Sequence, residues 1–554
     1  MLLLLLFAAT LVRAENYPTW CGKHYQLGAP LAAPHPSTRF PIPPLSPTPL
    51  LDFQCAQAVT PYIEGDDTSV LIDLLLNHRR GVDWGTAAGP LTISVEVGGQ
   101  RVGGEVLEVG ARAQKIEIDL SGVAPRREPY SLRCRATREA GGVLEVDGKL
   151  RYLSPSSYGG SVVRQDAATG GLLTLEDDRW TPFFPLGFYV QFGGFLETNL
   201  TVLDDMKARG FNVFHPVPTF DNLTALDLVL DRAEELGLWL MYDMRWSYMD
   251  LDSVRKQVEL IRRRKNLLLW YTADEPDGPS DPLDAPRLTY DLIQELDGYH
   301  PVSLVLNCAD FQWAPYSAGA DILLTDPYPL HLNTSFSPVY HTSCDSTFGC
   351  CGCDNCIGSL EDVSYRVDTS FDRRFLSGRE RNLSVWMVPQ ALGNSEFWTG
   401  IPSERDFLAM AVLGILHGVT GILPWTLPTS SEVLQGATKL ASLVPYLKSF
   451  ILDASATSTN LSTNASAVQA RLWTVNAAAF LLVTNSANES VVAKADFEGL
   501  LGVGDWRAML QEGVEVLEDG GEGMLLALEP FGTGGWVRQT AEGGEVAVEL
   551  VLQG

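Results

Sequence analysis

The chain has 554 residues, of which 45% are hydrophobic and 19% are charged, and its formal net charge is −28. This composition is typical of a globular protein with room for several domains, and it excludes a disordered chain or a coiled coil. An acidic chain repels phosphate backbones, so the charge also argues against a nucleic-acid partner.

The N-terminus carries a short apolar run. Residues 2–12 are almost entirely apolar, and the small residue Ala14 follows them. A run of this length before a small residue is typical of a signal peptide and is too short to span a bilayer. We therefore expect residues 1–14 to be a signal peptide and the mature protein to be secreted and extracellular, without a membrane partner.

Sequons and cysteines agree with export. Seven Asn-X-Ser/Thr tripeptides are potential glycan acceptors in a secreted chain. Nine cysteines in an oxidising compartment predict up to four disulfides and one remaining thiol. We expect the cluster from Cys344 to Cys356 to form disulfides that pin its segment, with Cys308 as a candidate outside partner; zinc binding is the weaker alternative because no His lies inside the cluster. The sequons begin at Asn199, Asn222, Asn333, Asn382, Asn460, Asn464 and Asn488.

Two β-rich regions flank the middle of the chain. Residues 15–50 are rich in proline, which predicts an extended lead. Short alternating runs such as Leu91–Val97 follow over 51–165, separated by glycine and proline, and they predict a β-sandwich. Similar runs return over 455–554 and predict a second, C-terminal β-sandwich.

Between these regions, over about 172–450, buried strands alternate with helices. Alternating units with buried strands imply a parallel sheet, and eight of them imply an α/β fold of the (β/α)8 TIM-barrel type. A doubly wound sheet is the alternative, but it needs no eighth unit. A Cys-rich insertion, 331–380, falls between the sixth and seventh strands. The expected strands are 183–190, 211–216, 238–243, 267–271, 302–306, 321–325, 383–388 and 422–425.

Carboxylates and aromatic side chains follow these strands. In such a barrel the catalytic groups lie at the C-terminal strand ends, and here those ends carry no cysteine nucleophile, phosphate loop or dinucleotide fingerprint. Aromatic faces suit sugar rings and carboxylates suit proton transfer at an acetal, so we predict glycoside hydrolysis of a carbohydrate substrate, without cofactor or metal. The candidate substrate-binding residues are Tyr189, His215, Asp243, Arg245, Trp246, Asp326, Tyr328, Gln390, Trp398 and Trp425.

Three motifs in this region resemble those of barrel glycoside hydrolases. Residues 270–276, Trp-Tyr-Thr-Ala-Asp-Glu-Pro, are similar to a fourth-strand motif in which a Glu before Pro is the acid/base. Residues 320–329 and 385–393 are similar to sixth- and seventh-strand motifs of related members. The resemblance covers roughly residues 180–430 and implies that Glu275 is catalytic.

The chain departs from the commonest clan of these enzymes at two positions. That clan pairs Asn-Glu on the fourth strand with a nucleophilic Glu at the end of the seventh, whereas this chain has Asp274-Glu275 and Gln390. An amide cannot form a glycosyl ester, so Glu396 in the following loop is the remaining possible nucleophile. The Asp-Glu pair instead resembles substrate-assisted hexosaminidases, which implies that Glu275 is the general acid and Asp274 orients the 2-acetamido group of the substrate.

Three readings of function stay open. The leading one is a secreted glycoside hydrolase that works by a substrate-assisted retaining mechanism. Its alternative is a retaining hydrolase of the clan A type, which uses a protein nucleophile. The second is a non-catalytic carbohydrate-binding barrel, suggested by Gln390, and the third is a structural glycoprotein that supports the Cys-rich insertion. Glu275 discriminates the first from the others, because binding alone requires no proton donor. His215 is equally compatible with structural packing, as are Trp246 and Trp398 taken singly.

Overall fold

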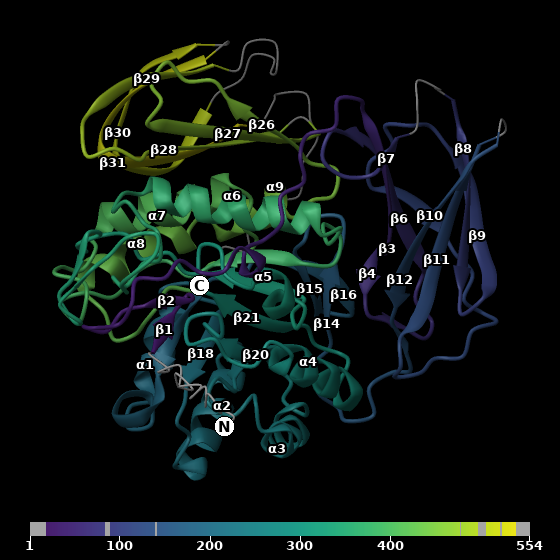
Figure 1. Ribbon diagram of the computed structural model, residues 1–554, viewed down its shortest axis with the longest axis horizontal. Coiled ribbons are helices and arrows are strands. Elements are labelled where there is room, and N and C mark those ends of the chain that lie inside the picture. The colour runs from purple at the N-terminus through teal and green to yellow at the C-terminus, as the bar shows by residue number, and fades with distance from the viewer. Residues whose placement is uncertain are drawn as a thin grey trace, which may run out of the picture.

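The computed structural model describes residues 18–83, 89–138, 141–476, 478–496, 506–520 and 523–538. At its centre lies a parallel sheet with the strand order β17-β18-β19-β20-β21-β22-β25 (Figure 1). The signal peptide predicted at residues 1–14 lies outside the described residues. The strands are β17 (Gly187–Gln191), β18 (Val213–Val217), β19 (Trp239–Asp243), β20 (Leu267–Asp274), β21 (Val302–Leu306), β22 (Ile322–Thr325) and β25 (Ser384–Met387).

An eighth segment closes this sheet, where a strand was predicted at 422–425. Ile422 forms isolated parallel bridges at both edges of the sheet. One joins it to Met387, the last residue of β25, and the other to Leu186, just before β17. The backbone N–H of Leu423 also donates to the carbonyl of Met387 over 3.0 Å. The sheet is therefore continuous around a barrel, although the pairing at the eighth position is confined to single bridges.

Helices follow most of the strands and cover the outside of the barrel. Before α2, the Asn222 side chain accepts a hydrogen bond from the Ala225 N–H at 3.1 Å, and a Ser403–Asp406 capping box begins α7. After α1, Gly210 adopts φ +85°, a left-handed conformation that glycine accepts without strain and that ends the helix. The helices are α1 (Thr201–Ala208), α2 (Leu223–Glu235), α3 (Leu251–Ile261), α4 (Ala285–Leu296), α5 (Trp313–Ser317), α6 (Glu361–Leu376), α7 (Glu404–Leu416), α8 (Ser431–Ala441) and α9 (Val444–Ile451).

Helix α6 lies inside the segment predicted as an insertion, 331–380. It packs on β22 and β25, as a barrel helix between these strands does. The segment added to the barrel is thus the loop 331–360, which holds the cysteine cluster and the short pair β23 (Phe336–Ser337) and β24 (Thr342–Ser343). We call this loop the Cys-rich loop.

Two antiparallel sheets pack against each other beside the barrel, at the right of Figure 1. Their buried side chains form one shared core, and the disulfide Cys55–Cys134 joins β3 of one sheet to β11 of the other. A small sheet of β4, β14, β15 and β16 lies between this pair and the barrel. The strands are β3 (Leu50–Gln57), β4 (Val59–Thr60), β5 (Tyr62–Ile63), β6 (Ser69–Asn77), β7 (Val82–Asp83), β8 (Leu91–Val97), β9 (Gln100–Leu107), β10 (Gln114–Glu117), β11 (Tyr130–Thr137), β12 (Val143–Leu150), β13 (Tyr152–Leu153), β14 (Val163–Asp166), β15 (Leu172–Glu176) and β16 (Arg179–Phe183).

The C-terminal strands form one antiparallel sheet that folds over its own core. Strand β31 pairs with β29 along its first half and with β28 along its second. The sheet packs on α7 and α9, which separate it from the barrel (Figure 1). The strands are β26 (Thr457–Leu461), β27 (Val468–Val475), β28 (Ala478–Asn485), β29 (Val491–Asp496), β30 (Trp506–Gly520) and β31 (Gly523–Arg538).

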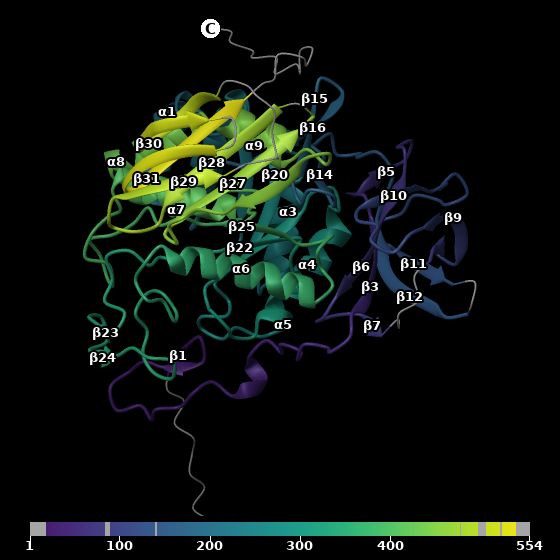
Figure 2. The ribbon, with the colours of Figure 1, turned by 90° about the horizontal axis from the view of Figure 1, so that it is seen from above.

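The predicted Pro-rich lead runs along the barrel and the Cys-rich loop as an extended arm (Figure 2). We call residues 18–49 the N-terminal arm; it contains β1 (Thr19–Trp20) and β2 (Lys23–His24). The Tyr25 ring lies 4.4 Å from the ring of Tyr340 in the Cys-rich loop, and Phe40 packs edge-on against Trp313 at 5.4 Å.

Disulfides hold these segments together. The predicted bridges within the cysteine cluster are confirmed as Cys344–Cys351 and Cys353–Cys356, and Cys350 is the remaining thiol. The candidate pairing of Cys308 with the cluster is wrong, because Cys308 is bonded to Cys21 of the arm. A bond across 287 residues of sequence leaves no local pattern from which it could be predicted.

The sequon asparagines lie on the surface, as potential glycan acceptors must. All seven Asn residues that begin a sequon are exposed, from Asn199 on the barrel to Asn488 on the C-terminal sheet. Each is therefore accessible to a glycan, and glycosylation stays a prediction. Within the described part of the chain, no helix combines the length and apolar character needed to cross a membrane.

Candidate active site

A chain of buried ionic contacts spans the ends of three neighbouring strands. His215 of β18 contacts Asp243 of β19 through Nε2 and Oδ2 at 2.7 Å, and both side chains are fully buried. Arg245 donates from Nε to Asp243 and from Nη1 to Asp274 of β20, each at 2.7 Å. Burial raises the pKa of Asp243, but Arg245 and His215 outweigh it, so the net shift is downward. Asp243 is thus an anion that holds Arg245 in place.

Aromatic rings surround this chain. Tyr189 of β17 stacks on His215 at 3.9 Å between ring centroids and meets Trp425 edge-on at 5.2 Å. The Arg245 guanidinium lies 4.8 Å from the Trp425 ring centroid. The Tyr271 hydroxyl donates to Asp274, whose side chain keeps 24% of its surface exposed. Asp274 therefore presents a fixed, partly exposed carboxyl group among these aromatic side chains.

Glu275 follows Asp274 and faces a different set of groups. Its backbone has φ +51°, a left-handed conformation that is uncommon for a residue with a side chain and that costs on the order of 1–3 kcal/mol. Burial, and then the charge of the neighbouring Asp326 and hydrogen bonding with it, raise the pKa of Glu275 well above its ordinary value. Glu275 therefore keeps a proton at a pH where an ordinary glutamate has lost it.

Asn307, at the end of β21, connects Glu275 to the N-terminal arm. Its Nδ2 donates to Glu275 Oε1 at 3.1 Å, while its Oδ1 accepts from the indole N–H of Trp20 at 3.0 Å. Because the indole can only donate, it fixes Oδ1 toward Trp20 and Nδ2 toward Glu275. Asn307 was not among the predicted site residues, and no local signal in the sequence links it to Trp20.

Two more carboxyl groups support this side of the site. Asp277 accepts from the backbone N–H groups of Asn307 and Cys308 at 3.2 and 2.8 Å. Burial raises the pKa of Asp277 to about 7 and that of Asp326 also to about 7. Asp326 therefore ionises only near neutral pH, and its charge then favours the protonated form of Glu275.

The other predicted site residues take different places. Tyr328 is buried, and Asp326 and Glu275 contribute to the raised pKa of its hydroxyl, which places it on the Glu275 side. Trp398 lies beneath it and donates from Nε1 to the Tyr328 carbonyl at 2.9 Å. Trp246, the residue after Arg245, is 71% exposed. It therefore lies outside the buried network and is accessible to solvent.

Gln390 and Glu396 lie apart from the carboxyl cluster. Gln390 is fully buried, and its amide accepts from the Leu330 N–H at 3.0 Å and donates to the Leu330 carbonyl at 3.1 Å. It therefore ties the loop after β22 to the end of β25. Glu396 is exposed in the loop after β25.

One cluster of possible metal ligands occurs in the described part of the chain. The sulfur atoms of Cys21 and Cys308 and a carboxylate oxygen of Asp354 lie within 4.8 Å of one another. Both sulfurs are joined in a disulfide, and the ligand of a metal is a thiolate. In the oxidised protein this cluster is a covalent anchor for the arm.

Comparisons with known proteins leave the function to be argued from this geometry. The sequence matches no protein-family model and no curated protein. A GH30 endoxylanase from Clostridium papyrosolvens has a TM-score of 0.42 and 11% identity, over 65% of this chain and 97% of that one. An α-amylase from Geobacillus thermoleovorans has a TM-score of 0.41 and 11% identity, over 64% of this chain and 98% of that one. A family 2 glycosyl hydrolase from Bacteroides cellulosilyticus has a TM-score of 0.31 and 11% identity, over 90% of this chain and 76% of that one.

Proposed function

We propose that this protein is a secreted glycoside hydrolase in which Glu275 is the general acid. The observation that carries the proposal is the state of Glu275: a strand-end carboxyl group in strained backbone, with a raised pKa and a hydrogen bond from Asn307. General acids work when they hold a proton near the operating pH. In this proposal the sugar ring lies beside that proton, against the aromatic side chains around the fixed Asp274.

Substrate assistance is the mechanism that we favour. The two adjacent carboxyl groups serve different partners: Asp274 is held by Arg245 and Tyr271, whereas Glu275 is held by Asn307 and Asp326. We infer from these contacts that Asp274 orients a substrate amide that attacks the anomeric carbon, while Glu275 protonates the leaving oxygen. In this scheme the 2-acetamido group is the nucleophile, so the protein supplies none.

The positions of other carboxyl groups favour this scheme over its alternatives. Glu396, the predicted protein nucleophile, is exposed in its loop. Asp326 and Glu275 both accept from Asn307 Nδ2, at 3.5 and 3.1 Å, whereas an inverting pair needs a gap of about 6.5–9.5 Å to hold the attacking water. A non-catalytic binding barrel does not require a carboxyl group with a raised pKa, so this feature favours an enzyme over a lectin-like protein.

The test of the activity is the substitution Glu275→Gln, assayed on a panel of nitrophenyl glycosides that includes 2-acetamido sugars. We expect wild-type activity on at least one glycoside and a loss of about 10²–10⁴-fold in the variant, the usual contribution of a general acid. The matched control is Glu396→Gln, which removes an exposed carboxylate from the same face. Retention of most activity by Glu275→Gln would contradict the assignment.

A second pair of measurements tests the mechanism. Asp274→Asn should cripple hydrolysis of 2-acetamido glycosides almost as severely as loss of Glu275, and a thiazoline analogue of the bridged intermediate should bind far more tightly than substrate, because it resembles the transition state. Covalent attachment of a mechanism-based fluorosugar to Glu396 would establish double displacement instead.

A further inference from the structure

A cavity of about 350 Å³ lies between the N-terminal arm and the Cys-rich loop. Trp20 and Lys23 of the arm form part of its lining, and residues from Thr334 to Cys356 form the rest. Neither segment belongs to the repeating barrel units. The volume falls in the range of roughly 300–1,000 Å³ that is usual for small-molecule sites.

The walls of this cavity are fixed before any ligand arrives. Cys21–Cys308 anchors the arm, and Cys344–Cys351 and Cys353–Cys356 brace the loop. The indole of Trp20 packs on Gly278, where a Cβ atom would lie only 2.5 Å from the ring. A rigid, preformed site binds with less loss of conformational entropy than a mobile one.

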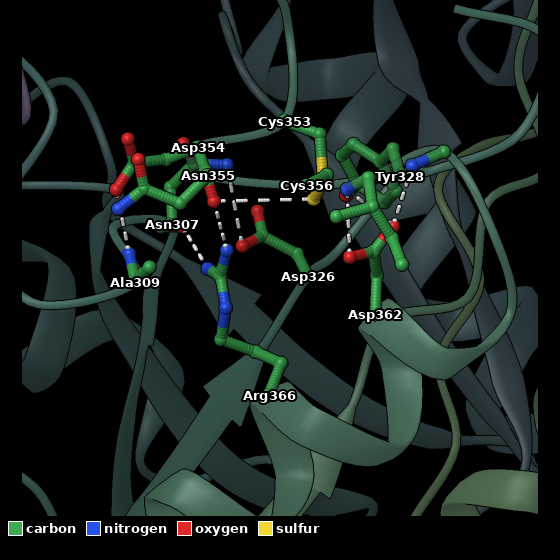
Figure 3. The surroundings of a disulfide bond; sticks show 12 residues. Asn307, Ala309, Asp326, Tyr328, Cys353, Asp354, Asn355, Cys356, Asp362 and Arg366 are labelled. Carbon is green, nitrogen blue, oxygen red and sulfur yellow. Dashed lines mark hydrogen bonds between the residues drawn. A yellow bond between two sulfur atoms is a disulfide. The ribbon is translucent and has the colours of Figure 1, made fainter. Parts of the chain in front are cut away.

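The cavity is linked to Glu275 through hydrogen bonds that begin at its lining residue Trp20. Trp20 reaches Glu275 through Asn307. Arg366 donates both to the Asn307 carbonyl and to the carbonyl of Asp354, which lines the cavity. Figure 3 shows Asp326 pointing toward the segment 354–356, with Arg366 and Asn307 beside it. With the sugar ring against the aromatic side chains near Asp274, the cavity remains for the group attached across the scissile oxygen.

The charges of the cavity indicate an uncharged occupant. The Lys23 ammonium is only 6% exposed and is taken up by Asp354 at 2.5 Å and Asn355 at 2.7 Å. Asp345 adds an exposed carboxylate to the rim, and its contacts with Thr347 hold the pKa of that carboxyl below its usual value. Among the described residues that line the cavity, no cation is therefore left over to attract a phosphate, sulfate or carboxylate. Amides, backbone groups and one indole instead suit hydroxyl groups and a pyranose face.

We propose that this cavity is the binding site for the leaving-group side of the substrate and that it takes a neutral sugar unit. The inference rests on the proposed function, since it assigns the cavity to the part of a glycan released when Glu275 protonates the glycosidic oxygen. The enzyme then acts on a saccharide of at least two units, with Trp20 as the platform next to the bond that is cleaved.

The experiment measures binding without turnover. The Glu275→Gln protein is applied to an array of neutral, sialylated and sulfated oligosaccharides, beside Glu275→Gln combined with Trp20→Ala. We expect retention of neutral di- and oligosaccharides and a loss of about tenfold in affinity without the indole, which corresponds to about 1.4 kcal/mol. A second variant, Ser346→Trp, fills the cavity from an exposed lining position and should lower affinity without touching the barrel core. Leu31→Ala, an exposed position in the same arm, is the matched control.

The outcomes separate this proposal from the proposed function. Three results overturn the leaving-group site, even if wild-type protein hydrolyses small aryl glycosides. The first is that the Trp20→Ala and Ser346→Trp proteins bind as tightly as the Glu275→Gln protein without these changes. The others are a preference for anionic glycans and no saccharide binding. Full hydrolysis by Glu275→Gln overturns the proposed function itself. If both hold, Trp20→Ala in the otherwise wild-type enzyme lowers kcat/KM for a disaccharide but not for the glycosyl fluoride of the same sugar, whose leaving group is too small to enter the cavity.

Discussion

At the scale of single residues, Glu275 and Asp274 show how neighbours in sequence acquire different chemistry. The left-handed backbone at Glu275 turns its side chain away from Asp274, so that one carboxyl group faces Arg245 and Tyr271 and the other faces Asn307 and Asp326. The strain is tolerable because β20 and β21 hold this turn, with the Glu275 N–H donating to the Val305 carbonyl at 3.2 Å. The left-handed φ angle of Glu275 thus allows the carboxyl groups of two consecutive residues to contact different partners.

The substitution Asp326→Asn tests the origin of the raised pKa of Glu275. Asp326 has a pKa of about 7, so its negative charge is present mainly above that pH, where it helps Glu275 to retain a proton. Removing the charge lowers the pKa of Glu275, and the alkaline limb of the kcat/KM profile should move to lower pH. Each unit of displacement costs about tenfold in activity on that limb.

Activity near pH 5 should change less than activity above pH 7, because Asp326 is already neutral at the lower pH. A pH profile measured for both proteins checks this difference. A uniform loss at every pH would instead mean that Asp326 acts by shaping the site.

At the scale of elements, the N-terminal arm is the part of the site that the barrel does not supply. Its attachment depends on Cys21–Cys308, so the double substitution Cys21→Ser/Cys308→Ser should free Trp20 from Asn307. We expect faster proteolysis within residues 18–49 and a fall in kcat/KM on a disaccharide of about tenfold, with little change in the far-UV circular dichroism.

The matched control for the arm is Cys55→Ser/Cys134→Ser, which removes a disulfide from the N-terminal sheets. Loss of a native disulfide typically costs about 2–5 kcal/mol, so the control should lower the thermal midpoint while leaving kcat/KM unchanged. Equal activity in the arm variant and the control would show that the disulfide serves stability alone.

The barrel elements could be predicted from the sequence because their signals are local. Apolar runs with a strand period predict strands such as 302–306, which the structure has as β21, and the strand ends point to Tyr189, His215, Asp243 and Asp326. Contacts between distant segments carry no such period. Trp20 and Asn307 meet only because the chain folds back across 287 residues, and Gln390 binds the Leu330 backbone instead of facing the carboxyl cluster.

At the scale of the whole molecule, the acidic cluster couples stability to pH. Burial raises the pKa of Glu275, Asp277 and Asp326 above their unfolded values. A group with a raised pKa in the folded state favours folding when protonated, and that contribution is lost as the pH rises through the folded pKa. The net charge of −28 acts in the same direction, because self-repulsion grows as the carboxyl groups ionise.

We therefore expect the protein to be more stable in mild acid than at neutral pH. The thermal midpoint should fall by at least a few degrees between pH 5.5 and pH 8, since 1 kcal/mol corresponds to about 2–4 °C for a domain of 150–250 residues. Asp326→Asn removes one of the titrating groups and should flatten this dependence, raising the midpoint at pH 8 relative to wild type more than at pH 5.5. Calorimetry of both proteins across that range makes the comparison. A midpoint that rises toward pH 8 would mean that ion pairs such as His215–Asp243 and Arg381–Asp73, which need their carboxylates ionised, outweigh the acidic cluster.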